Sequence, residues 1–166
     1  MEDATTTTKT RTVRGLKYRE DAYGVLIPEA LFLRDGERFA KPEDAIPYLG
    51  AERAAEQEHF VVITLDGAQQ VIKKHTVTIG LVNRSQVHAR ETFRPAIQDN
   101  AASIIVAHNH PSGSLEASVD DLLTTRRLAE AGRLLGIPVL DHIIVSRDGI
   151  KSLRETYPDY FTVSRN

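Results

Sequence analysis

The residues with the clearest capacity for chemistry lie in one short segment, residues 107–121. It reads AHNHPSGSLEASVDD and contains His108 and His110, two positions apart, followed by Ser118 and Asp121. The chain has no cysteine, so any metal must be held by imidazole nitrogens and carboxylate oxygens. Three such ligands with a fourth position left for water are the pattern of catalytic zinc rather than structural zinc.

A strand must end at the two histidines if their side chains are to meet. Residues 104–107, IIVA, are short and continuously apolar, which is typical of a strand covered on both faces. Alternate side chains of an extended chain point the same way, so the imidazoles of His108 and His110 can face one point. Pro111 ends the strand, and a polar loop is expected from His108 to Ala117.

The third ligand depends on the helix that follows this loop, which is the clearest helix in the sequence. It is predicted to run from Ser118 to about Leu135, with Gly136 placed to cap its C-terminus. Asp121, Leu128 and Leu135 are seven residues apart and share one helix face. If the leucines mark the core side, Asp121 points inward, toward the strand end that carries the histidines.

Each part of this cluster also has a purely structural interpretation. Ser118 and Asp121 in an S-x-x-D pattern could be a helix-capping pair, and capping is compatible with metal binding through other atoms. His108 and His110 alone could be a hydrogen-bonded loop cluster. His142, in a second apolar segment, is predicted to be a hydrogen-bonded core histidine.

The remaining pattern predicts an α/β protein with a mixed central sheet flanked by helices and a short N-terminal extension. Apolar runs predict strands at 60–65, 70–79 and 139–145, and the first two should form a hairpin through a turn at Asp66-Gly67. Helices are expected at 41–56 and 89–99, with a loop at 83–85. The N-terminal extension should contain short strands at 25–27 and 31–33. The predicted division is a disordered or frayed tail at 1–14, an extension and helix at 15–56, and the main domain at 57–166.

The composition sets few limits on partners. The net charge is −2, from 21 basic and 23 acidic residues, which gives no global attraction to nucleic acid. The sequence has no stretch long enough to span a membrane and no signal-peptide core, so we expect a cytoplasmic protein that does not bind membranes.

The spacing His108-x-His110-x7-Ser118-x2-Asp121 resembles the signature of the JAMM (MPN-plus) metalloproteases. The words HNHPSG, and LDHIIV at 140–145, are similar to the RadC family of that superfamily, and the resemblance runs from about Gln57 to Glu155. It implies a JAMM/MPN-like, cytidine-deaminase-like fold and hints at a homodimer. A deaminase itself is excluded, because it needs a P-C-x-x-C motif.

The resemblance also implies one zinc ion per chain, held by His108, His110 and Asp121. It implies a water activated by an upstream glutamate and a serine, Ser118, that supports the tetrahedral intermediate. Glu58 matches the position of that glutamate, just before the predicted strand at 60–65. Glu91 is the competing candidate for the base.

Two functions follow as hypotheses. The first is a zinc metallopeptidase or isopeptidase acting on a peptide or protein substrate. The alternative is a DNA-repair-associated protein that binds or cuts nucleic acid, as the RadC name suggests. RadC proteins usually carry a helix-hairpin-helix region before this domain, and no such region is recognisable in the sequence. A zinc-stabilised scaffold without turnover is a third possibility, against which the complete ligand set argues.

Overall fold

The computed structural model describes residues 10–13, 16–20, 26–28, 38–80 and 87–162. Its elements, in chain order, are β1 (Thr10–Val13), β2 (Leu16–Glu20), β3 (Leu26–Pro28), the 3₁₀ helix η2 (Pro42–Tyr48), α1 (Gly50–Ala54), β4 (His59–Leu65), β5 (Val71–Ile79), α2 (Ala89–Gln98), β6 (Ser103–Asn109), α3 (Val119–Leu135), β7 (Val139–Val145), β8 (Ile150–Ser152), α4 (Leu153–Thr156) and the 3₁₀ helix η3 (Pro158–Tyr160).

Five strands form a mixed sheet in the order β5-β4-β6-β7-β8. β4 pairs antiparallel with both β5 and β6, β6 and β7 are parallel, and β8 returns antiparallel to β7. β6 and β7 are parallel because α3 carries the chain back between them. The predicted α/β class, mixed sheet and β4–β5 hairpin are therefore confirmed.

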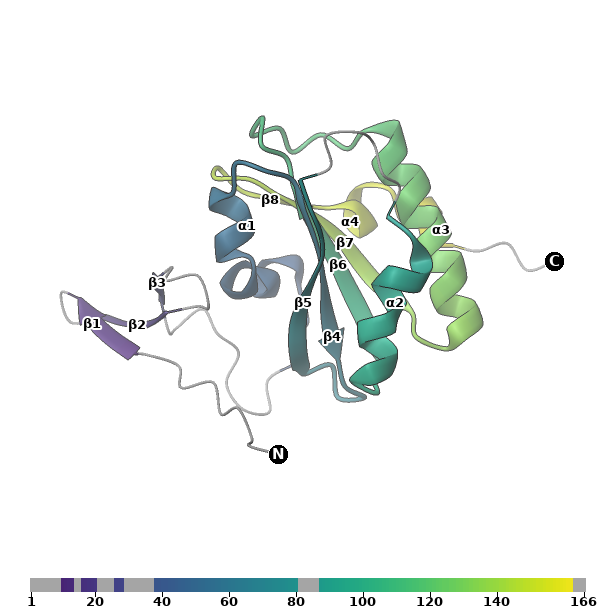
Figure 1. Ribbon diagram of the computed structural model, residues 1–166, viewed down its shortest axis with the longest axis horizontal. Coiled ribbons are helices and arrows are strands. Elements are labelled where there is room, and N and C mark those ends of the chain that lie inside the picture. Colours follow the sequence, from purple (N-terminus) through teal and green to yellow (C-terminus); the bar gives the residue numbers. More distant parts are fainter. Residues whose placement is uncertain (1–9, 14–15, 21–25, 29–37, 81–86, 163–166) are drawn as a thin grey trace.

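The central strands β4, β6 and β7 are buried on both faces, and different helices cover each face of the sheet (Figure 1). On one side, side chains from α2 and α3, such as Phe93 and Leu128, pack against Phe60, Val62 and Val106. On the other side, the buried side chains of Phe39, Ala45 and Leu49, which precede β4 in the chain, pack against the sheet. Burial on both faces explains why β4 and β6 read as continuous apolar runs.

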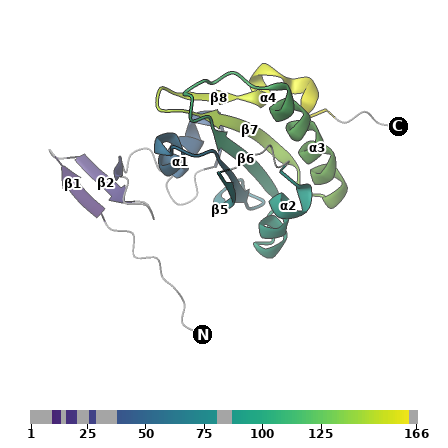
Figure 2. The same ribbon diagram turned by 45° about the horizontal axis from the view of Figure 1, so that its top comes forward.

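The small sheet β1-β2-β3 is separate from the main sheet. In two views it lies on the side of α1, away from α2 and α3 (Figure 1, Figure 2). The strand expected at 25–27 corresponds to β3, whereas that expected at 31–33 and the loop at 83–85 lie outside the described residues. Within the predicted tail, residues 10–13 form β1.

The single helix predicted from 41 to 56 is wrong, because the segment forms η2 and then the short helix α1. Pro47 lacks an N–H for the α-helical hydrogen bond, and the backbone leaves helical geometry at Leu49. Both pieces still pack on the sheet, since Ala45 and Leu49 are fully buried. Residues 39–54 therefore belong to the same core as β4.

Two expectations near the histidines also need correction. β6 extends to Asn109, so His108 lies inside the strand and the loop begins at His110. Leu128 is buried as expected, but Leu135 is 49% exposed. Leu135 is the last residue of α3.

Among the described residues, no helix has the length and apolar character needed to cross a bilayer.

Candidate metal centre

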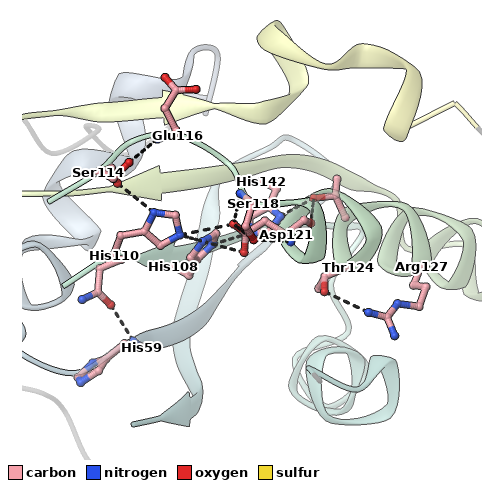
Figure 3. A network of polar contacts seen from close by, with 12 residues as sticks. His59, His108, His110, Ser114, Glu116, Ser118, Asp121, Thr124, Arg127 and His142 are labelled. Carbon is pink, nitrogen blue, oxygen red and sulfur yellow. Dashed lines mark hydrogen bonds and ion pairs between the residues drawn. The ribbon is translucent and has the colours of Figure 1, made fainter. Parts of the chain in front are cut away.

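His108, His110 and Asp121 meet at the end of β6, as the spacing predicted. The Nε2 atoms of His108 and His110 are 2.9 Å apart. His108 Nε2 lies 3.3 Å from Asp121 Oδ1, and His110 Nε2 lies 3.5 Å from Asp121 Oδ2. Figure 3 shows the three side chains pointing toward one another from the strand end and from the start of α3.

The start of α3 holds Asp121 in place. Ser118 is the N-cap residue, and its Oγ accepts a hydrogen bond from the Asp121 backbone N–H. Asp121 Oδ2 in turn accepts from the backbone N–H and the hydroxyl of Ser118, each at 2.7 Å. The capping box proposed as the structural alternative is therefore present. It leaves Asp121 Oδ1 directed at His108, while Oδ2, which Ser118 holds, also lies near His110.

The donor set fits a zinc ion. His110 Nδ1 lies 3.0 Å from the carbonyl oxygen of Ser114, which can only accept, so this nitrogen carries a proton and Nε2 has a free lone pair whenever the ring is neutral. Two ligand nitrogens of a tetrahedral zinc ion are separated by about 3.3 Å, given Zn–N distances of about 2.0–2.1 Å. The separations of 2.9, 3.3 and 3.5 Å lie close to this value.

The electrostatics show that the three groups strongly influence one another. Burial alone would raise the pKa of Asp121, but the adjacent side chains of His108, His110 and Ser118 outweigh it and hold that pKa far below its ordinary value. Hydrogen bonding to Asp121 raises the pKa of His110, against the opposing effect of burial. Without a metal, the site therefore favours an ionised Asp121 beside a protonated His110.

Access to the site is one-sided. The side chain of His108 is only 2% exposed, whereas those of His110 and Asp121 are each 17% exposed. An ion held by the three ligands would keep a side open to solvent, as a catalytic zinc site requires.

The buried side of His108 packs against Phe60 and His142. The Phe60 ring stacks on His108 with ring centroids 6.2 Å apart. His142 Nε2 lies 2.8 Å from His108 Nδ1. The prediction that His142 is a buried, hydrogen-bonded histidine is confirmed, but its contact with a metal-ligand candidate was not foreseen. Burial holds the pKa of His142 well below its ordinary value, so the ring is neutral.

Asn109 connects the histidine pair to the segment that carries Glu58. Its Oδ1 accepts from the His59 backbone N–H at 2.7 Å, and its Nδ2 donates to the Gln57 carbonyl at 2.9 Å. The Glu58 carbonyl accepts from the Gly80 N–H at 2.8 Å. The backbone around the exposed Glu58 is thus held on both flanks. Glu58 lies close enough to His110 for its negative charge to contribute to the raised pKa of His110.

Glu91 lies elsewhere. It is exposed in the first turn of α2, pairs with Arg90 at 3.3 Å and lines a surface pocket with Phe93 and Arg94. None of its contacts in the described part of the chain involves the metal-ligand candidates.

Comparisons with known proteins identify the family of the chain. A family model described as a RadC-like JAB domain matches residues 39–157. The match begins at Phe39, the first residue of the core on the α1 side of the sheet.

Several curated relatives carry the name UPF0758 protein. The one from Methanospirillum hungatei is 55% identical over 98 residues, which are 59% of this chain and 44% of that protein. Those from Bacillus licheniformis and Geobacillus thermodenitrificans are 50% and 49% identical over 115 residues, 69% of this chain and 51% of each relative. The chain thus spans about half the length of these relatives. With the family model matched across most of the described residues, the chain belongs to the RadC-like JAB domain family.

Proposed function

We propose that this protein is a zinc-dependent hydrolase that cleaves an amide bond in a peptide or isopeptide substrate. The observation that carries the proposal is the convergence of two imidazole nitrogens and one carboxylate on a point open to solvent on one side. A structural zinc site would close the fourth position with another protein ligand. The cluster found among the described residues contains three ligands.

When bound, zinc would polarise the scissile carbonyl and lower the pKa of a coordinated water to about 7. Glu58 would accept the proton of the attacking water and deliver it to the leaving nitrogen. Its backbone is held on both sides, by Asn109 and by Gly80, which supports this role.

Ser118 would stabilise the oxyanion of the tetrahedral intermediate. Its hydroxyl proton is directed to Asp121 Oδ2 in the structure, so this role requires the hydroxyl to turn toward the substrate. The Asp121 N–H bond to Ser118 Oγ is compatible with that rotation, because the oxygen stays in place while its proton moves.

The nucleic-acid alternative has less support. Several of the basic residues that could form a patch are engaged locally: Arg126 lies over the Tyr160 ring, Arg127 donates to the Leu123 carbonyl, Arg90 pairs with Glu91, and Lys74 pairs with Glu52. Association through phosphate contacts would weaken steeply with salt. A DNA affinity that did not change with salt concentration would exclude this alternative.

The test compares Glu58→Gln with Glu91→Gln. Zinc-loaded proteins are incubated with a fluorogenic peptide library and with a lysine-branched isopeptide, and zinc content is measured in parallel. Glu58→Gln should keep its zinc and lose turnover by about 10²- to 10⁴-fold, the usual contribution of a general base. Glu91→Gln should behave as the wild type.

Full turnover in the Glu58 variant would show that the proposed base is wrong. A loss confined to the Glu91 variant would transfer the role to that residue. Zinc binding with no turnover of any peptide or isopeptide would instead favour the scaffold interpretation.

A further inference from the structure

A chain of buried polar groups lies behind His108, on the side away from solvent. His108 Nδ1 is 2.8 Å from His142 Nε2, and His142 Nδ1 is 2.7 Å from Thr125 Oγ1. Thr125 Oγ1 is in turn 2.8 Å from the backbone carbonyl oxygen of Asp121. Counted as whole residues, His108, His142 and Thr125 are each at most 1% exposed. Figure 3 shows His142 close to His108 and Asp121.

The hydrogen bond between Thr125 and the Asp121 carbonyl fixes which atom donates at every step of this series of hydrogen bonds. A carbonyl oxygen can only accept, so Thr125 donates its single hydroxyl proton to Asp121. The Thr125 oxygen then faces His142 as an acceptor, and His142 must carry its proton on Nδ1. A neutral imidazole has one N–H, so His142 Nε2 is an acceptor and His108 Nδ1 is the donor to it.

This order leaves His108 Nε2 with a free lone pair, directed at His110 and Asp121. The reverse order would have Thr125 donate to His142, His142 donate to His108, and His108 carry its proton on Nε2. That proton would occupy the position where a metal must bind. The Ser114 carbonyl sets the same tautomer directly in His110.

We propose that Thr125 and His142 are positioning residues, which hold His108 in the Nδ1–H tautomer that ligation through Nε2 requires. The proposal rests on the zinc site proposed above. It adds that the metal affinity depends on the Thr125 hydroxyl, although this group touches neither metal nor substrate. Asp121 thereby contributes twice, through its carboxylate as a ligand and through its backbone carbonyl as the acceptor at the end of the chain.

The test uses a matched pair of substitutions, Thr125→Val and Thr125→Ser. Valine keeps the shape of threonine and lacks the hydroxyl, whereas serine keeps the hydroxyl and lacks the methyl group. Zinc affinity is measured by competition with a chromophoric chelator, and folding is checked by thermal unfolding of the metal-free proteins. Thr125→Val should weaken zinc binding by about 10-fold or more, as outer-shell substitutions do, while Thr125→Ser stays within about threefold of the wild type. Equal affinity in Thr125→Val and wild type would overturn the proposal, as would equal weakening in both variants.

A second measurement does not depend on the variants folding. Long-range ¹H–¹⁵N correlation spectra of the wild-type protein, metal-free and zinc-loaded, report which nitrogen of each imidazole carries the proton. His142 protonated on Nδ1 supports the proposal, and His142 protonated on Nε2 overturns it. If the wild type bound no zinc, the proposed function would fail, but the His142 tautomer would still test the proton order in the metal-free protein.

Discussion

His110 is the residue at which protons and metal compete most directly. Its hydrogen bond to Asp121 raises its pKa despite the opposing effect of burial, so the metal-free site retains a proton at higher pH than an ordinary histidine would. This proton stabilises the metal-free fold at low pH, and the stabilisation is lost as pH rises through the raised pKa. Zinc needs the neutral ring, so the effect on metal affinity has the opposite sign.

We therefore predict that zinc affinity falls as pH decreases through the raised pKa of His110, beginning above the ordinary histidine value of about 6.5. Chelator competition between about pH 8 and about pH 6 measures this, with proton release followed by calorimetry in two buffers of different ionisation enthalpy. An affinity that stayed constant across this range, with no proton released, would contradict the protonated His110–Asp121 pair.

Residue types and spacing were sufficient to predict the three ligand candidates and the Ser118 cap. The role of His142 could not be predicted in the same way. His142 is the register partner of Val106 in the parallel β6–β7 pair, so its ring reaches His108 diagonally across two strands. That contact depends on which strands are neighbours, and no local pattern in the sequence carries this information. The hydrogen bonds from the Asn109 side chain to the backbone of residues 57 and 59 also depend on which strands are neighbours.

Among the elements, α3 has the most influence on the site, because its first turn carries Asp121. Gly132 lets this helix approach its surroundings closely: a Cβ there would lie 2.5 Å from the Ile137 carbonyl oxygen and 3.1 Å from Phe93 Cζ. Helix propensity alone would favour alanine at this position by up to about 1 kcal/mol. The clash with backbone outweighs that gain, since the Ile137 carbonyl cannot rotate away as a side chain could.

We predict that Gly132→Ala lowers the free energy of unfolding by about 1–3 kcal/mol, the range for overpacked sites. Urea denaturation of the metal-free protein measures this. Gly136→Ala is the matched control, because that residue has φ 71° and open space around its Cβ position. Its expected loss of about 1 kcal/mol comes from backbone conformation alone. A Gly132→Ala variant as stable as the wild type would show that α3 can shift without penalty.

The boundaries of α3 were predictable because both of its ends carry strong local signals, the S-x-x-D cap and a glycine in the left-handed region. Residues 42–54 lacked comparable signals. The acidic first turn predicted a start correctly, but Pro47 and Gly50 allowed either one interrupted helix or two short pieces. Ala45 and Leu49, on either side of Pro47, both pack against the sheet, and no local pattern in the sequence carries that tertiary contact.

At the scale of the whole molecule, a buried ion pair ties the segment before β4 to the edge strand of the sheet. Glu52 of α1 is fully buried, and its two carboxylate oxygens lie 2.9 and 3.1 Å from Lys74 Nζ on β5. Removing the lysine would leave a carboxylate buried without its cation, which is strongly unfavourable.

Lys74→Met is therefore predicted to lower the free energy of unfolding by about 3 kcal/mol. Lys73→Met on the same strand, where the lysine is exposed, should change it by no more than about 0.5 kcal/mol. Chemical denaturation followed by circular dichroism distinguishes the two variants. Equal effects would mean that the pair does not contribute to holding α1 on the sheet.

The mixed sheet and its flanking helices were predictable from the alternation of strands and helices together with the family resemblance. The start of the domain was less apparent, because Phe39 joins the core from a segment that gives no strand or helix signal of its own. Its burial becomes visible only once the sheet face that it covers has been assembled.

Metal content is the most direct test of whether His108, His110 and Asp121 bind zinc. Tag-free protein, reconstituted with zinc and dialysed, should hold about one zinc ion per chain by elemental analysis. Glu58→Gln should hold the same amount, whereas His110→Ala should hold little. Wild-type protein that retained no zinc, or a His110→Ala variant that retained as much as the wild type, would contradict the assignment of this site.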